Sequence, residues 1–216
     1  MVKIKFSYWD AHGLGLSTRY LLEFVGADYE EKIHQIDKKD EWFNEKYNLG
    51  LLFPNLPYLI DGENKLTEHL AIMRYIARKY KLAPENEKET ILVDQVEYIV
   101  CDLRIKLYKV AYDQTNYEKS KKEYIDMVNE KLESLEKLLN SHNYVVGERI
   151  TYIDIYLFDY LFLLNAFNGQ ILQNKPNLMK YLNIMKELPS IKAYKNSSRW
   201  KVRTFCGPLA VFKETY

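Results

Sequence analysis

The sequence predicts an α/β region followed by an all-helical region. Up to residue 83, short segments with apolar residues at every second position alternate with segments of helical spacing. Beyond that point every segment has helical spacing. A polar connector that contains a proline, LAPENEKE at residues 82–89, separates the two patterns. We therefore expect two domains, residues 1–83 and residues 84–216.

The first region is predicted to have the order β-α-β followed by β-β-α. The first strand places Val2, Ile4, Phe6 and Tyr8 on one face, and Gly26 closes the helix that follows. The expected elements are, in order, a strand at residues 2–9, a helix at 17–26, a strand at 29–36, an irregular stretch at 41–50, a hairpin at 56–66 and a helix from about residue 67.

The second region is predicted to be entirely helical. Apolar residues recur at helical spacing in residues 90–112, 117–141, 154–167 and 176–188. Ahead of the third of these helices, Thr151 and Asp154 have the spacing of a capping box, and Ile150 and Ile155 flank it as a hydrophobic staple. This pattern indicates a helix start rather than an active site.

Composition and charge exclude several classes of function. The 31 Lys and Arg residues nearly balance the 30 Asp and Glu residues, so we expect neither nucleic acid nor an anionic membrane as partner. No apolar run approaches the roughly 20 residues of a membrane span, and the first residues lack the apolar core of a signal peptide. Cys101 and Cys206 are far apart and predict two free thiols. We expect a cytoplasmic, globular protein that binds a small neutral or zwitterionic ligand.

Tyr8 is the best single candidate for chemistry. It ends the first strand and precedes the loop WDAHGLG, and open α/β sheets bind ligands at the carboxyl ends of their strands. Its alternative role is that of a core tyrosine on the apolar face of the strand. His12, His34, His69 and His142 are scattered without the spacing of a metal site, and glycine-rich nucleotide motifs are absent, so no metal is expected.

Two features beside the hairpin predict where an extended ligand would lie. Pro57 precedes a hairpin strand, and a cis bond there would expose the backbone of Leu56 to a peptide-like ligand. The next helix begins near Thr67, Glu68 and His69, and amides at a helix start bind anionic groups. The alternative is that Thr67 is an ordinary N-cap and that Glu68 merely favours the positive end of the helix.

Four stretches of the sequence together decide between these alternatives: YWDAHGLG, EWFNEKYNLGLLFPNLPYLIDG, AIMRYIARKYKL and KAYKNSSRW. They resemble the mu-class glutathione transferases, and the order of elements is similar over essentially the whole chain. The resemblance implies a thioredoxin-like first domain that binds glutathione and a helical second domain that supplies the wall for small hydrophobic electrophiles. It implies detoxification by conjugation, with glutathione as cosubstrate and no other cofactor. The short segment between Gln35 and Trp42 makes the invertebrate members the closer resemblance.

The resemblance assigns Tyr8 as the hydrogen-bond donor to the glutathione sulfur. A free thiol has a pKa of about 8.5 and the thiolate is the nucleophile, so this donor raises the reactive fraction. The resemblance also implies sets of residues for glutathione, the electrophile and a homodimer interface. Those for glutathione are Trp9, Leu14, Trp42, Lys46, Asn55, Leu56, Pro57, Glu68, His69 and, from the neighbouring subunit, Asp102. Those for the electrophile are Leu14, Ile105, Tyr108, Tyr112 and Phe205. Those for the interface are Phe53, Arg74, Arg78, Asp94 and Glu97.

The sequence departs from the family's usual residues at four positions. The family usually has Gln-Ser in place of Glu68-His69, Arg in place of His12 and Gly in place of Ser7. A carboxylate at Glu68 would meet the α-ammonium of the γ-glutamyl group, while the ring of His69 replaces a small hydroxyl and its amide stays available. Two functions therefore remain open: an active glutathione transferase, and a non-catalytic ligand-binding or structural protein of the same fold.

Overall fold

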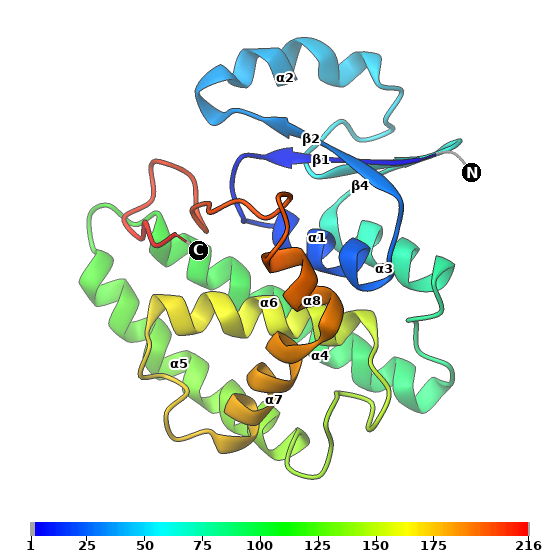
Figure 1. Ribbon diagram of the computed structural model, residues 1–216. Helices are drawn as coiled ribbons and strands as arrows, with labels where there is room; N and C mark the ends of the chain where they lie inside the picture. The colour runs from blue at the N-terminus through cyan, green and yellow to red at the C-terminus, as the bar shows by residue number, and fades with distance from the viewer. Residues whose placement is uncertain (1–2, 216) are drawn as a thin grey trace.

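A computed structural model describes residues 3–215 of the chain. The first part contains β1 (Ile4–Trp9), α1 (Gly15–Phe24), β2 (Tyr29–His34), α2 (Lys39–Glu45), β3 (Tyr58–Asp61), β4 (Asn64–Thr67) and α3 (His69–Lys79). This order confirms the predicted βαβ–ββα arrangement. Figure 1 shows this part stacked on the helical part of the chain, with α2 on one side of the sheet and α1 and α3 on the other.

The four strands form one sheet in the order β2-β1-β3-β4. β1 pairs with β2 in parallel, with Tyr8 opposite Ile33, and with β3 antiparallel, with Phe6 opposite Leu59. Ile4, Phe6 and Tyr8 are all buried, as the alternation in the sequence predicts, while Val2 lies outside the described residues. The sheet thus delivers Tyr8 to the carboxyl end of a central strand.

The stretch at residues 41–50 is largely helical, so the prediction of an irregular segment was wrong. α2 is followed by a 3-10 turn at Lys46–Asn48 and preceded by another at Ile36–Lys38. The sequence KDEWFNE of α2 contains neither Gly nor Pro, and its first turn carries Asp40 and Glu41, which favour the positive end of a helix. The helix is too short for a periodicity argument, and burial of Trp42 fixes it.

The second part contains α4 (Glu87–Ala111), α5 (Tyr117–Leu138), α6 (Tyr152–Phe167), α7 (Pro176–Glu187) and α8 (Pro189–Lys195). The four predicted helices are confirmed, and α8 is an addition. α8 begins with a proline at its first turn, where the missing N–H costs nothing, and it buries Ile191 and Tyr194. The predicted division at residues 83/84 falls in the segment between α3 and α4, and the division itself stays a prediction.

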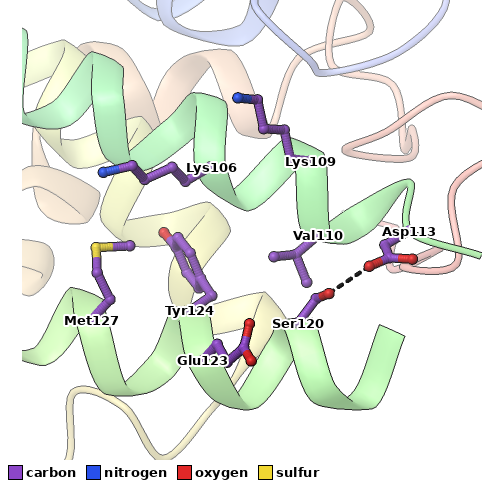
Figure 2. A pocket seen from close by; sticks show the side chains of 8 residues that line it. All are labelled: Lys106, Lys109, Val110, Asp113, Ser120, Glu123, Tyr124 and Met127. Carbon is purple, nitrogen blue, oxygen red and sulfur yellow. Dashed lines mark hydrogen bonds between the residues drawn. The ribbon is translucent and has the colours of Figure 1, made fainter. Parts of the chain in front are cut away.

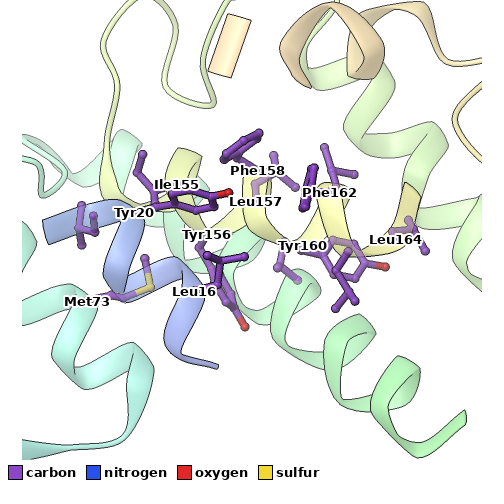
Figure 3. Close-up of a cluster of buried hydrophobic side chains, with 14 of the residues drawn as sticks. Leu16, Tyr20, Met73, Ile155, Tyr156, Leu157, Phe158, Tyr160, Phe162 and Leu164 are labelled. Carbon is purple, nitrogen blue, oxygen red and sulfur yellow. The ribbon is translucent and has the colours of Figure 1, made fainter. Parts of the chain in front are cut away.

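α6 is the centre of the core. It is apolar on all sides, and nearly all of its residues are buried. Figure 3 shows Tyr156, Phe158 and their neighbours on α6 meeting Leu16 and Tyr20 of α1. Helices from both parts of the chain therefore share one core, which holds the sheet against the helical bundle.

The capping box predicted at the start of α6 is confirmed. The Asp154 carboxylate accepts a hydrogen bond from the backbone N–H of Thr151 at 2.8 Å, and its other oxygen accepts one from the N–H of Val145, also at 2.8 Å. Burial nevertheless raises the pKa of Asp154 to about 6. The box positions the start of the central helix and takes no part in a ligand site.

The carboxyl-terminal segment returns to the sheet part of the chain. The N–H groups of His12 and Gly13 donate to the carbonyls of Thr204 and Phe205 at 2.9 and 3.1 Å. Further along, the N–H of Val211 donates to the carbonyl of Ala111 at the end of α4, at 2.7 Å. These bonds tie together the loop after β1 and the end of α4. Within residues 3–215, no helix is both long and apolar enough to span a bilayer.

Candidate active site

Tyr8 is the penultimate residue of β1, just ahead of the loop that joins β1 to α1. Its side chain is 9% exposed, and its hydroxyl oxygen accepts a hydrogen bond from the backbone N–H of Leu14 at 3.2 Å. That bond occupies the oxygen and leaves the hydroxyl proton available to another acceptor. A Cβ added at Gly13 would lie 2.7 Å from the Tyr8 hydroxyl oxygen, and one at Gly15 would lie 2.6 Å from its ring. The two glycines therefore make room for the tyrosine.

The hydroxyl of Tyr8 stays protonated at neutral pH. Burial raises the pKa of Tyr8, and the Leu14 amide and the charges of Arg19 and Arg104 oppose that rise. A protonated phenol donates a hydrogen bond and does not act as a base. This protonation state is the one that a donor to a thiolate needs.

A hollow of about 190 Å³ opens beside Tyr8. It is lined by Tyr8, Trp9, Ala11, Gly13, Ile36, Phe205 and Gly207. A second hollow of about 490 Å³ shares Ile36 and Gly207 with it and extends along Asp37, Lys39, Tyr112, Pro208 and Leu209. Both hollows lie between the turn after β2 and the carboxyl-terminal segment; the first also borders the loop after β1, and the second borders the end of α4.

The predicted electrophile wall is only partly gathered at these hollows. Phe205 lines the first hollow and Tyr112 the second. The Tyr112 hydroxyl accepts a hydrogen bond from the N–H of Gly207 at 2.6 Å, which joins the end of α4 to the carboxyl-terminal segment. Ile105 is half exposed on α4.

The other two predicted wall residues lie close to the Tyr8 loop. The backbone N–H of Leu14 donates a hydrogen bond to the Tyr8 hydroxyl. Tyr108 lies beside Arg104, and the Arg104 Nε is 3.3 Å from the Tyr108 hydroxyl. Sequence reasoning missed the lining positions Ala11, Gly13, Ile36, Pro208 and Leu209. They sit in loops, where no periodic pattern marks a residue that faces a hollow.

The residues predicted to hold the glycyl end of glutathione lie on and after α2. Trp42 is buried, with its ring stacked on Tyr58 at a centroid distance of 5.9 Å. The ammonium of Lys46 lies over the rings of Phe43 and Tyr47, at 5.0 and 4.8 Å from the centroids. Trp9 is half-buried, and its ring meets that of His34 edge-on at 6.1 Å. A buried indole and a cation held on aromatic faces form the α2 side of the site.

The segment before β3 has the predicted backbone form. The Leu56–Pro57 bond is cis, as expected. The side chain of Asn55 makes two contacts: its oxygen accepts from the Leu56 N–H at 2.9 Å, and its NH₂ donates to Glu68 at 3.1 Å. Asn55 thus connects the edge of the sheet to the start of α3.

The start of α3 differs from the N-cap alternative. Thr67 belongs to β4, where it pairs with Tyr58, so it does not cap the helix. Glu68 takes the N-cap position with φ +67°, in the left-handed region that few side chains adopt, and its side chain makes no cap hydrogen bond. The exposed Glu68 carboxylate is therefore directed away from the helix, toward Asn55.

The ring of His69 turns inward to the helical part. Its Nε2 lies 3.4 Å from the Tyr156 hydroxyl, and the two ring centroids are 5.7 Å apart. Burial, followed by the charge of Arg104, lowers the pKa of His69 to about 3. The imidazole is therefore neutral at pH 7. This environment disfavours the imidazolium form that would pair with a ligand carboxylate.

Another hollow, of about 410 Å³, lies between α4 and α5 (Figure 2). Lysines line it from α4, and Glu123, Tyr124 and Met127 line it from α5. Asp102, predicted to reach the neighbouring subunit, is exposed on α4 and accepts a hydrogen bond from Lys106 at 2.7 Å. None of the residues around Tyr8 lines this hollow, so it is separate from the candidate site.

The predicted interface residues differ in exposure. Phe53 is 67% exposed and Asp94 is exposed, whereas Glu97 is buried. Glu97 pairs with Arg74 of the same chain and accepts a hydrogen bond from the Tyr152 hydroxyl at 2.7 Å. The pair of Arg74 and Glu97 is thus formed within one chain, and Glu97 orients Arg74 rather than facing outward.

Comparison with known proteins identifies the family. The model of the glutathione S-transferase N-terminal domain matches residues 4–78, and that of the C-terminal domain matches residues 101–198. This chain belongs to the glutathione S-transferase family. It is an enzyme of that class, and the similarity favours the enzyme over the non-catalytic alternative.

Relatives named glutathione S-transferase, several of them of the mu class, extend over nearly the whole chain. Glutathione S-transferase Mu 2 of Macaca fuscata fuscata is 40% identical over 210 residues, covering 95% of this chain and 96% of the relative. A glutathione S-transferase of the mite Tyrophagus putrescentiae is 39% identical and covers 97% and 96%. These identities do not separate vertebrate from invertebrate relatives.

Solved structures agree with this assignment. The glutathione S-transferase Blo t 8 superposes with a TM-score of 0.91 at 30% identity, covering 97% of this chain and 100% of that one. The Pi-class glutathione S-transferase of Onchocerca volvulus gives a TM-score of 0.84 at 27% identity, covering 97% and 100%. The predicted fold of a thioredoxin-like domain followed by a helical domain is confirmed.

Proposed function

We propose that this transferase conjugates the thiolate of glutathione to small hydrophobic electrophiles and that Tyr8 stabilises the thiolate. The single observation that carries the proposal is the state of Tyr8: a buried, protonated hydroxyl whose oxygen is already occupied by the Leu14 amide and which borders an open hollow. Its proton is free to meet sulfur. Lowering a thiol pKa by about 2 units corresponds to roughly 2.7 kcal/mol.

Glutathione would extend from Tyr8 along the edge formed by the segment before β3. The backbone of Leu56, next to Pro57, would pair with the peptide, and Asn55, Trp9 and Leu14 would contact it. The γ-glutamyl carboxylate would lie at the amides of Glu68 and His69, with the Glu68 carboxylate on the α-ammonium. The glycyl carboxylate would meet Trp42 and Lys46.

The electrophile would enter the two hollows that share Ile36 and Gly207. Their walls are mainly apolar, as hydrophobic cosubstrates require. Glutathione is the cosubstrate, and we propose no other cofactor. The proposed setting is detoxification in the cytoplasm.

The active form is proposed to be a two-fold homodimer. Phe53 is the exposed apolar side chain that would fit a pocket of the partner, and Arg74, Arg78 and Asp94 would also contribute to the interface. Asp102 would reach the neighbouring glutathione site. Sedimentation of a fully active monomer at micromolar concentration would contradict this assembly.

The experiment that tests the proposed function is retention on immobilised glutathione followed by turnover of a generic aryl halide. Retention with turnover that is lost on Tyr8→Phe supports thiolate chemistry at Tyr8. Retention without any turnover would instead identify a glutathione carrier. Tyr20→Phe, which alters a buried tyrosine outside the hollow, is the matched control for the loss of a hydroxyl.

A further inference from the structure

Arg104 of α4 crosses from the helical part to the loop that follows Tyr8. Its side chain is 1% exposed. One guanidinium nitrogen donates to the carbonyl of Gly13 at 2.8 Å, and another donates to the Asp159 carboxylate at 2.8 Å. The third, Nε, donates to the Tyr108 hydroxyl at 3.3 Å. The three guanidinium nitrogens of Arg104 thus donate to three different groups at the same time.

A second buried arginine holds the same loop from the other side. Arg19 of α1 donates to the carbonyl of Ala11 at 2.8 Å and to that of Trp9 at 3.4 Å, and it pairs with Glu31 at 2.6 Å. Three alternate carbonyls, one at the end of β1 and two in the loop after it, are therefore held by guanidinium groups. Arg19 acts from within the thioredoxin-like part, whereas Arg104 acts from the helical part.

The bond to Gly13 acts on Tyr8 directly. Gly13 packs against the Tyr8 hydroxyl, and the next residue, Leu14, donates the amide that occupies the hydroxyl oxygen. A shift of the Gly13 peptide therefore moves both the surface behind the hydroxyl and the donor that orients it. The guanidinium charges of Arg104 and Arg19 also lie near enough to oppose the effect of burial on the pKa of Tyr8.

We propose that Arg104 is a positioning residue for thiol activation: through the Gly13 carbonyl it holds the Tyr8 hydroxyl in its donating orientation, with Asp159 fixing the guanidinium. This inference rests on the proposed function. It assigns the helical part a role in the chemistry as well as in binding the electrophile, because the residue that supports Tyr8 from behind belongs to α4 and its anchor to α6.

The test is Arg104→Lys, because lysine keeps the charge and loses the fork that reaches Gly13 and Asp159 together. We expect kcat/KM for an aryl halide to fall about tenfold and the apparent pKa of the bound glutathione thiol to rise by about one unit, the equivalent free-energy change. The KM for glutathione should change less than kcat. The control is Arg149→Lys, since Arg149 also bridges a backbone carbonyl, that of Ala83, and a carboxylate, that of Glu89, away from Tyr8. It should leave both quantities unchanged.

A double variant separates positioning from stability. In a Tyr8→Phe background, Arg104→Lys should lower kcat/KM less than about twofold, because its effect runs through the missing hydroxyl. An equal loss with and without that hydroxyl, or an unchanged thiol pKa in the single variant, overturns the inference. If Arg104→Lys does not fold, Asp159→Asn tests the same link and should raise the thiol pKa in the same direction. Loss of activity in Tyr8→Phe without any effect of these variants would leave the proposed function standing and reject this role for Arg104.

Discussion

The two ends of the proposed glutathione site are built differently. At the Tyr8 end, the loop is held by backbone bonds to residues 204 and 205 and by two buried arginines. At the γ-glutamyl end, the Glu68 carboxylate is exposed and bonded to the side chain of Asn55. The end proposed for the chemistry is held by contacts to main-chain groups in a buried place, while the end proposed to recognise the γ-glutamyl group presents a side chain open to water.

The departures from the family's usual residues lie at both ends of the proposed site. His12 is buried: its backbone N–H donates to the carbonyl of Thr204, and its ring stacks on Trp200 at a centroid distance of 5.1 Å. The backbone amide of His69 belongs to the first residue of α3, so its position does not depend on the orientation of the side chain. The ring packs on Tyr156. Substitutions at the buried end around Tyr8 should have larger effects on turnover than substitutions at the exposed end around Glu68 have on glutathione binding.

The largest effect is expected from Gly13→Ala. The new Cβ would meet the Tyr8 hydroxyl oxygen at 2.7 Å, and φ at this residue is +39°. We expect kcat/KM to fall on the order of 100-fold, about 2.7 kcal/mol, because the hydroxyl must move. Steady-state kinetics measures this loss.

The control for Gly13→Ala is Gly62→Ala in the hairpin turn, with φ +61° and open space around its Cβ. Both variants place a Cβ on a backbone with positive φ, which should lower the free energy of unfolding by about 1–2 kcal/mol. Gly62→Ala should nevertheless keep full activity. Equal activity losses in the two variants would show that backbone strain, and not crowding of Tyr8, is responsible.

Tyr8→Phe should lower turnover by about 10- to 100-fold, which corresponds to about 1.4 to 2.7 kcal/mol. The fold and most of the affinity for glutathione should remain, because the hydroxyl is proposed to contact only the sulfur. Turnover and the pKa of the bound thiol are measured together. If both stay at their wild-type values, Tyr8 has no part in the mechanism.

Glu68→Ala should weaken glutathione binding by about 1.5 kcal/mol, the lower end of the range for a hydrogen bond to a charged group, because the carboxylate is exposed. Calorimetric titration measures the change. Glu68→Gln is the matched variant, since an amide keeps an acceptor for the ammonium and for Asn55 and should lose less. A full loss in Glu68→Gln with no loss in Glu68→Ala would reverse this assignment.

The smallest effect on binding is expected from His69→Ser, less than about threefold in affinity at pH 6 and pH 8. The reason is that the proposed contact is the amide, while the ring is neutral and packed on Tyr156. If this variant binds glutathione more weakly than Glu68→Ala does, and wild-type affinity falls as pH rises through about 6.5, the ring is an imidazolium partner after all.

His69 should also set part of the acid sensitivity of folding. Its pKa in the folded chain is about 3, below the ordinary 6.5, so between these values the unfolded chain binds the extra proton. The free energy of unfolding should therefore fall with pH below 6.5, by about 2 kcal/mol at pH 5 from this residue alone. Denaturant unfolding of wild type and His69→Ser at pH 7 and pH 5 checks the difference. A parallel loss in both proteins would remove His69 as its source.

Much of the architecture was predictable because it depends on patterns of apolar and polar residues close together in the sequence. Alternation in β1, helical spacing in four long helices and the Thr151–Asp154 box each depend on neighbouring residues. α2 and α8 escaped prediction because they have seven residues each, too few to show a period. The alternative role of Thr67 as an N-cap is excluded only by the structure, because a threonine can end a strand or cap a helix, and its pairing with Tyr58 decides between the two.

By itself the sequence determined the order of the strands and of the longer helices, the place of Tyr8 at the end of a strand and, through its resemblance, the family. Only the tertiary structure decided that Arg104, anchored by Asp159, reaches the loop after Tyr8, that Ile36 and Gly207 line the hollow beside Tyr8, and that the ring of His69 turns to Tyr156. Arg104 contacts Gly13 across 91 positions of the chain. Contacts between such distant residues arise when separate elements pack, so no local pattern in the sequence can encode them.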